Sequence, residues 1–162
     1  MKNKAWLILC IITVIAGVAL GCTNLLTKDS IAEQEVIALK GQPDAVYQIG
    51  DSRLLEWSVG AWSQYAYMAK IGPDGKLVSY EQVLTREKFG SIPIDRFTKL
   101  DVLQTVGHPT ETDYLPLIDR EVWAYRYKEE GIWNSMMYIY FDSQGIVRRM
   151  ENGMDPMYLR AN

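Results

Sequence analysis

The stretch GHPTETDYLPLIDREVW, residues 107–123, has a counterpart earlier in the chain in GQPDAVYQIGDSRLLEW, residues 41–57. In both stretches a Gly-x-Pro tripeptide follows a short amphipathic run, and a tryptophan comes after alternating residues. The glycine, the proline and the tryptophan all recur at a spacing of 66 residues. A fixed offset that keeps three such residues together predicts two tandem copies of one supersecondary unit.

The Gly-x-Pro tripeptide is typical of a helix end. A glycine at the C′ position adopts the left-handed backbone that stops a helix, and a proline just beyond it prevents continuation. We therefore expect a first helix that begins at Asp29 or Ser30, with Ser30 and Glu33 as a capping box, and a second from Arg96 or Thr98 to Val106. The residues assigned structural roles are Gly41, Pro43, Trp57, Gly107, Pro109 and Trp123.

Runs of alternating residues, separated by glycine-containing turns, predict four strands after each helix. The expected strands are 45–49, 55–59, 63–71 and 76–84 in the first copy and 110–115, 121–127, 133–141 and 146–151 in the second. The fold class is therefore α+β: two tandem repeats, each a short helix or helix pair packed on an antiparallel sheet of about four strands. The expected boundaries are 29–90 for the first repeat and 91–152 for the second, with a polar crossing at 85–95 and an irregular tail at 153–162.

The last turn of the second copy lies 70 residues after its counterpart, which places four added residues between Trp123 and the third strand of that copy. We assign Trp57 and Trp123 to the sheet–helix interface, because core packing is the default for aromatic residues that alternate along a strand. Leu55 and Val59 share the face of Trp57, as Tyr125 and Tyr127 share that of Trp123.

The opposite face of the second sheet is the candidate binding surface. Met136, Tyr138 and Tyr140 are expected to point outward, and Met137, Ile139 and Phe141 inward. An exposed stripe of methionine and tyrosine indicates a protein interface, since tyrosine is enriched there. The alternative is that the two sheets cover one another and bury the stripe. The candidate protein-binding residues are Met136, Tyr138, Tyr140 and Trp133.

The N-terminus has the pattern of a secretory signal. Lys2 and Lys4 precede an uncharged apolar run at 5–20, and small residues lead up to Cys22. This arrangement resembles a bacterial lipoprotein signal, which implies removal of residues 1–21, lipidation of Cys22 and a tether at 22–28. A single transmembrane anchor is the alternative, although a bilayer span needs about 20 apolar residues.

Removal of the signal would leave no thiol apart from Cys22 and would take away two lysines. The remaining chain has 15 basic and 20 acidic residues and so a net charge of −5. A protein of this charge binds neither nucleic acid nor anionic headgroups by electrostatics. The attached lipid would therefore hold it to the membrane.

The second copy also carries a family resemblance. Asp101-Val102, Val106-Gly107-x-Pro109, Trp123-x-Tyr125 and Asp142-x-x-Gly145 resemble the BamE (SmpA/OmlA) domain of small outer-membrane lipoproteins. The order of elements is also similar to the beta-lactamase inhibitor protein-like fold, in which helices pack on an antiparallel sheet. The resemblance implies location in the cell envelope. In such lipoproteins an aspartate directly after the lipidated cysteine signals retention in the inner membrane, so Thr23 implies sorting to the outer membrane, facing the periplasm.

No catalytic constellation is present in the sequence. His108 is the single histidine, and its counterpart in the first copy is Gln42, so we interpret it as a polar turn residue. Neither a phosphate loop nor a metal-ligand spacing occurs, and Asp142 to Gly145 lacks the spacing of a calcium loop. We predict no enzyme activity, no cofactor and no metal.

Two binding functions follow as expectations. The first is a lipid-anchored accessory or scaffold that binds an envelope protein, with outer-membrane protein assembly or envelope maintenance as its process. The alternative is an inhibitor or sensor that binds a periplasmic enzyme or a cell-wall component.

Overall fold

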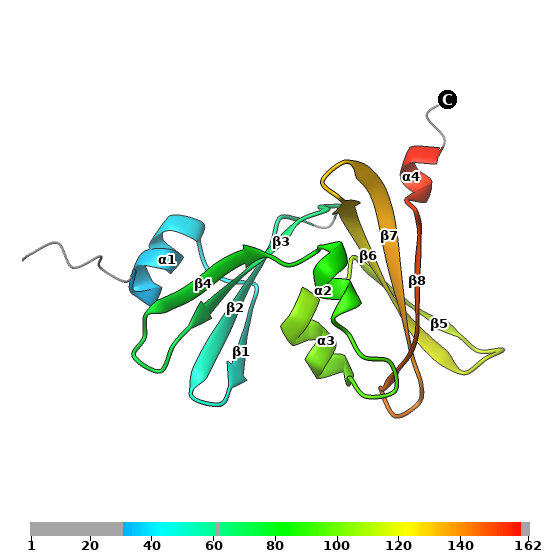
Figure 1. Ribbon diagram of the computed structural model, residues 1–162, viewed down its shortest axis with the longest axis horizontal. Helices are drawn as coiled ribbons and strands as arrows, with labels where there is room; N and C mark the ends of the chain where they lie inside the picture. The colour runs from blue at the N-terminus through cyan, green and yellow to red at the C-terminus, as the bar shows by residue number, and fades with distance from the viewer. Residues whose placement is uncertain (1–30, 61, 160–162) are drawn as a thin grey trace, which may run out of the picture.

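The computed structural model describes residues 31–60 and 62–159. These residues form two four-stranded antiparallel sheets, ordered β1-β2-β3-β4 and β5-β6-β7-β8, together with four short helices (Figure 1). The predicted α+β class with two antiparallel sheets is thereby confirmed. The elements are α1 (Glu33–Lys40), β1 (Ala45–Ile49), β2 (Ser52–Ser58), β3 (Ala66–Ile71), β4 (Leu77–Gln82), α2 (Arg86–Gly90), α3 (Lys99–Val106), β5 (Glu111–Leu115), β6 (Arg120–Glu129), β7 (Trp133–Phe141), β8 (Val147–Met154) and α4 (Pro156–Leu159).

The helices and sheets alternate along the long axis of the molecule. Figure 1 shows α1 beside the first sheet, then α2 and α3 between the two sheets, and then the second sheet. The idea that the two sheets cover one another is therefore wrong, because a helical layer separates them. The outer face of the second sheet has no such layer over its centre, and α4 lies at one end of it.

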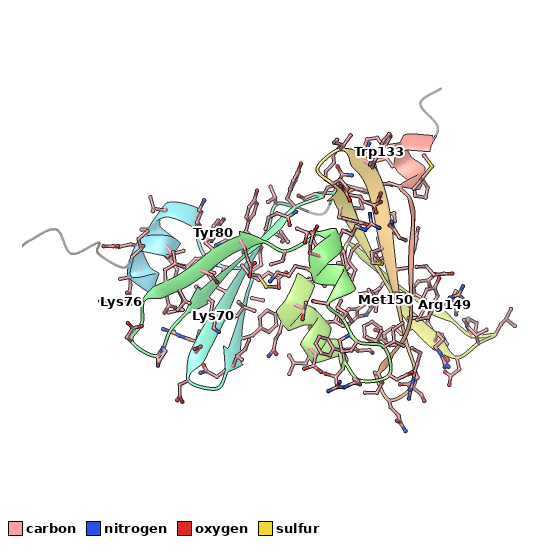
Figure 2. The ribbon with its side chains drawn as sticks, viewed as in Figure 1. Lys70, Lys76, Tyr80, Trp133, Arg149 and Met150 are labelled. Carbon is pink, nitrogen blue, oxygen red and sulfur yellow. The ribbon has the colours of Figure 1, made fainter. Side chains whose placement is uncertain are left out.

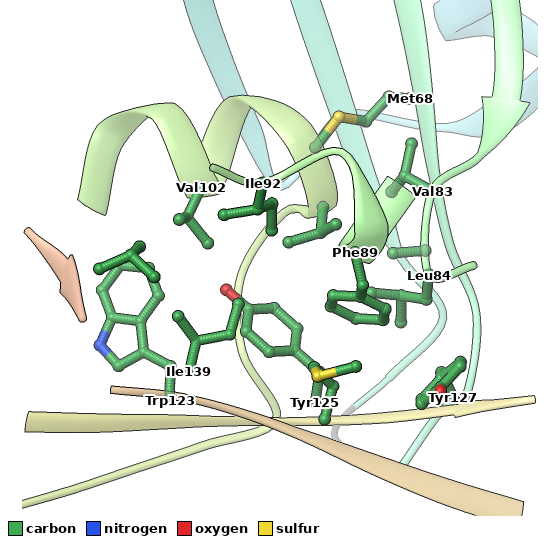
Figure 3. Packing of buried hydrophobic residues seen from close by; sticks show 14 of the residues in the cluster. Met68, Val83, Leu84, Phe89, Ile92, Val102, Trp123, Tyr125, Tyr127 and Ile139 are labelled. Carbon is green, nitrogen blue, oxygen red and sulfur yellow. The ribbon is translucent and has the colours of Figure 1, made fainter. Parts of the chain in front are cut away.

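Two hydrophobic clusters follow this order. Val36 of α1 lies in the smaller cluster with Leu55, Trp57, Ala69 and Ile71 of β2 and β3. The larger cluster joins the opposite side of the first sheet to the inner side of the second through α2 and α3 (Figure 3). Its members include Leu54, Met68, Phe89, Val102, Val106, Trp123, Tyr125, Tyr127, Ile139 and Phe141.

Helix α2 corrects the prediction of a polar crossing at 85–95. Thr85 caps it by accepting a 3.2 Å hydrogen bond from the Lys88 backbone N–H. Phe89 is 1% exposed and meets the rings of Tyr125 and Tyr127 at centroid distances of 5.6 and 5.1 Å. A helix of five residues shows no apolar period, so the sequence pattern missed it.

The ends of other elements also differ from expectation. Helix α1 has Ala32 at its N-cap, and the Glu35 carboxylate accepts from the Ala32 N–H, so the Ser30–Glu33 capping box is wrong. Helix α3 has Thr98 at its N-cap, within the predicted range. The tail from residue 153 is not irregular, because β8 continues to Met154 and α4 follows it.

The strand register corrects the pairing of the two copies. Ala45 pairs with Glu56 in the first sheet, and Glu111 pairs with Ala124 in the second, so β2 and β6 correspond at an offset of 68. Trp57 therefore corresponds to Tyr125, and each donates to the carbonyl of the helix-ending glycine at 3.0 Å. Two added residues lie in the β5–β6 turn and two between β6 and β7, instead of four after Trp123.

Both insertions contain an even number of residues. Side chains alternate across a sheet with a period of two, so an even insertion leaves every side chain on its original face. Trp123 consequently points inward, as Trp57 does in its own sheet, and both are more than nine-tenths buried. Val59 was expected to share the buried face of Leu55 and Trp57, but it lies beyond the end of β2 and is 61% exposed.

A buried carboxylate joins the two halves. Glu56 of β2 is fully buried and accepts hydrogen bonds from the Tyr47 hydroxyl at 2.6 Å and from the His108 backbone N–H at 2.8 Å. The Nδ1 atom of His108 lies 2.9 Å from the same carboxylate. Burial, with Glu56 alongside, raises the pKa of Tyr47. The turn that ends α3 is thus fixed to the first sheet.

The two helix-ending glycines provide a matched test of this joint. Gly41 and Gly107 have φ angles of +86° and +81°, so an alanine at either site costs about 1–3 kcal/mol in backbone strain. A Cβ at Gly107 would also lie 2.6 Å from Glu56 Oε1, whereas a Cβ at Gly41 meets nothing within 4 Å. We expect Gly107→Ala to lower the free energy of unfolding by at least about 2 kcal/mol more than Gly41→Ala, measured by urea denaturation. Equal losses would show that the Glu56 contact contributes nothing.

Candidate protein-binding face

The outer face of the second sheet is built from the side chains that point away from α2 and α3. Strand pairing places Val122 opposite Tyr140, Ala124 opposite Tyr138, and Arg126 opposite Met136 on this side. Figure 2 shows the alternation on β8, where Met150 lies on the inner side and Arg149 on the outer side. The outer face includes Glu111, Asp113, Leu115, Arg120, Val122, Ala124, Arg126, Lys128, Met136, Tyr138, Tyr140, Arg149 and Glu151.

Met136, Tyr138 and Tyr140 lie on this outer face, as predicted, but their exposure differs from expectation. Met136 is 3% exposed, so the prediction that it is accessible is wrong. The ion pair between Arg126 of β6 and Asp155, which follows β8, spans the intervening strand at the level of Met136. Tyr138 and Tyr140 are half-buried and remain part of the surface.

Tyr140 is held in place by its neighbours on β8. Its hydroxyl donates to Glu151 at 2.5 Å, and the Arg149 guanidinium lies 5.4 Å from the centre of its ring. Burial, together with the hydrogen bond to Glu151, raises the pKa of Tyr140 to about 12. Tyr138 makes no hydrogen bond through its hydroxyl within the described residues, so this hydroxyl is available to a partner.

Between the tyrosines and strand β5 the outer face is hollow. The hollow has a volume of about 350 Å³. Val122 and Ala124, each 7% exposed, line it together with Leu115. Glu111 and Asp113 line it from β5, and Tyr138 and Tyr140 from β7. Such a mixture of apolar surface with a few polar groups at the edge is typical of binding pockets.

The structure does not bring Trp133 into this hollow. Trp133 begins β7 and lies at the β6–β7 turn (Figure 2), where it is 66% exposed. It lines a separate groove of about 520 Å³ with Met154 and Tyr158. The four candidate residues therefore divide into a buried methionine, two tyrosines beside a hollow, and a tryptophan on the neighbouring groove.

Sequence reasoning missed the most strongly ion-paired side chain of this face. Arg126 is 7% exposed and donates to both Asp155 oxygens at 2.6 and 2.8 Å, and to Glu111 at 3.2 Å. Burial acts to lower the pKa of Arg126, but its hydrogen bonds to Asp155 and Glu111 raise it overall. Trp62, from the first half of the chain, packs against this guanidinium, whose central carbon lies 5.2 Å from the centre of the Trp62 ring. The partners are far apart in sequence, so no local motif marks them.

The joint around Glu56 was considered as a second candidate site. His108 is within a turn, as predicted, and its side chain is 54% exposed next to a small hollow of about 240 Å³. Its ionisable neighbours are Tyr47 and Glu56. Burial and the adjacent Glu56 raise the pKa of Tyr47, so its hydroxyl stays protonated and donates to the carboxylate. No group of three or more histidine, cysteine, aspartate or glutamate residues in the described parts of the chain is arranged to hold a metal ion.

Comparisons with protein families, with curated proteins and with solved structures give no match to this chain. Among residues 31–60 and 62–159, none of the helices has the length and apolar character needed to cross a bilayer. Cys22 and the tether at 22–28 lie outside the described residues.

Arg126 and its two carboxylates provide a test of what stabilises this face. Removing one partner of a buried ion pair costs about 3–5 kcal/mol, because the other charge is left uncompensated. Asp155→Ala should therefore lower the free energy of unfolding by about that amount, measured by urea denaturation. Glu111→Ala, at a carboxylate that is 57% exposed, should cost less than about 1 kcal/mol. Similar losses in the two variants would contradict a buried pair.

Proposed function

We propose that this protein is a lipid-anchored cell-envelope protein that binds another protein through the outer face of its second sheet. The observation that carries the proposal is the open face itself, with two tyrosines beside a hollow of about 350 Å³. Tyrosine contributes large contact area at low entropic cost and is enriched in interfaces. An accessory or scaffold role in outer-membrane protein assembly or envelope maintenance fits this arrangement.

The position of the chain ends supports the proposed anchor. Helix α1, which begins at Glu33, lies at one end of the molecule, and the second sheet lies at the opposite end (Figure 1). If Cys22 carries the lipid, the segment from Cys22 to Ile31 reaches at most about 30 Å, from 3.3–3.6 Å per residue. The membrane attachment would then be at the end far from the binding face, which leaves that face free for a partner in the periplasm.

The internal repeat on which the proposed family depends is supported by recurring contacts. Several backbone contacts recur in both halves, as expected of tandem BamE-like units in which a helix packs on a sheet. Glu33 N–H donates to the Gly75 carbonyl at 3.1 Å, and Lys99 N–H to the Gly145 carbonyl at the same distance. The isolated bridges Ala32–Lys76 and Thr98–Ile146 also correspond.

A specific feature favours the inhibitor as a second candidate function. The β5–β6 turn, which is two residues longer than its counterpart, carries Leu117 at 99% exposure and Ile118 at 52%. The Tyr114 hydroxyl donates to Asp119 at 2.6 Å across the base of the turn. A held, projecting apolar tip of this kind suits insertion into the cleft of a periplasmic enzyme.

The test of the main proposal is affinity purification from intact envelopes. The full chain should recover an envelope protein, and Tyr138→Ser/Tyr140→Ser should recover at least tenfold less of it while its urea midpoint stays within the range of other surface variants. The control is Tyr65→Ser, at a tyrosine that is 41% exposed and lies outside this face. Cys22→Ala should release the protein from the membrane fraction. Recovery of the chain alone from wild-type envelopes would contradict the proposal.

Leu117→Asp separates the two functions. If the protein acts as an inhibitor through the tip, this substitution should abolish recovery of a soluble hydrolase, since a charge at a buried contact costs several kcal/mol. If the protein acts as a scaffold through the outer face, Leu117→Asp should recover the same envelope partner as wild type. Val78→Asp, at another exposed aliphatic residue, controls for added charge.

A further inference from the structure

We infer that the hollow on the outer face receives a basic side chain, arginine or lysine, from an extended segment of the partner protein. This inference rests on the proposed protein-binding function and specifies its partner chemically. It follows from three properties of the hollow: an apolar floor, an aromatic wall and an acidic wall.

The floor and the aromatic wall suit the stem of a long side chain. Val122, Ala124 and Leu115 present aliphatic surface, and Tyr138 and Tyr140 present aromatic surface at the side. Lysine and arginine place their methylene stems on apolar surface while their charged groups contact water or polar groups. A cation near a tyrosine ring is also attracted by the ring quadrupole.

The acidic wall supplies the charge. Glu111 and Asp113 line the hollow from β5, and both are exposed. Arg126 is shared by Glu111 and Asp155, so one guanidinium faces two carboxylates and one negative charge is left over. Asp113 has no ion-pair partner among the described residues and supplies a second uncompensated negative charge.

The basic residues of the outer face do not reverse this sign. Arg149 is paired with Glu151, and Arg126 is held on both sides by carboxylates. Arg120 and Lys128, which donate to the backbone carbonyls of Asp119 and Ile132, keep their positive charges, but neither of them lines the hollow. The hollow therefore attracts a cation rather than a carboxylate or phosphate, and the net charge of −3 on the whole chain adds attraction at longer range.

The volume is consistent with one such side chain. About 350 Å³ exceeds the volume of a single arginine side chain and leaves space for bridging water. Among the described strands, β5 is at the edge of the sheet and pairs with β6 alone. An extended partner segment that runs along this edge can place an alternate side chain in the hollow.

The experiment uses the full chain, purified in detergent, and a pair of small probes. Nα-acetyl-arginine amide and the neutral, nearly isosteric Nα-acetyl-citrulline amide are titrated separately, and the methyl resonances of Val122, Ala124 and Leu115 are followed by NMR. We expect saturable shifts with the arginine probe, in the millimolar range, and at least tenfold weaker binding of the citrulline probe. Glu111→Gln/Asp113→Asn should weaken arginine binding at least tenfold, and Asp51→Asn/Glu87→Gln, which removes two acidic charges elsewhere, should leave it unchanged.

Three results would overturn the inference: equal binding of the two probes, wild-type binding by Glu111→Gln/Asp113→Asn, or no shift at about 50 mM arginine probe, well above the expected dissociation constant. The envelope purification separates this inference from the proposed function. A partner lost with Tyr138→Ser/Tyr140→Ser but retained at full yield with Glu111→Gln/Asp113→Asn would leave the function standing and exclude the basic side chain. Arginine binding without any recovered partner would show that the hollow accepts a basic side chain and would contradict the proposed protein-binding function.

Discussion

The carboxylate of Glu56 determines how the two halves of the molecule meet. A fully buried carboxylate is unfavourable unless each oxygen has a donor, and here the donors come from both halves: Tyr47 from the first and the His108 turn from the second. The close approach requires glycine at position 107, because any Cβ there would collide with a Glu56 oxygen. The same glycine ends α3 and accepts from Tyr125 through its carbonyl. One residue thus couples the end of a helix, the second sheet and the joint.

The joint also accounts for the difference between the two copies at this position. In the first copy the glycine of the Gly-x-Pro turn has open space around it, and Gln42 beside it is exposed. In the second copy the equivalent turn packs on another sheet, and His108 contributes both its backbone N–H and its Nδ1 atom to Glu56. The difference between glutamine and histidine therefore reflects a contact that only the second copy makes. His108 therefore serves the assembly of the two halves.

Local patterns in the sequence predicted what local physics determines. The Gly-x-Pro turns, the positions of most strands and the inward direction of Trp57 and Trp123 follow from backbone conformation and from alternation along a strand, and these were predicted. The offset of 66 residues paired Trp57 with Trp123, whereas hydrogen bonding pairs Trp57 with Tyr125. An even insertion hides such a shift, since it leaves the inward and outward pattern unchanged. Glu56 with His108 and Arg126 with Asp155 could not be predicted, because each pair is formed only when distant segments fold together.

The alternation of layers places the free surface on the second copy. The first sheet has α1 on one side and α2 with α3 on the other, so neither of its faces is open at the centre (Figure 1). The second sheet has helices on one side only, yet its central strand β6 is buried from Val122 to Tyr127. On the outer side the sheet is covered by its own large residues: Met136, Tyr138 and Tyr140 of β7 and the ion-paired Arg126 lie around the small side chains of β6. Since Tyr138 and Tyr140 stand on β7, the side toward β5 is left uncovered, and the hollow occurs there with Glu111 and Asp113 at its edge. The distribution of large and small side chains on this face thus leaves a hollow beside β5, which is where we propose that a partner's side chain binds.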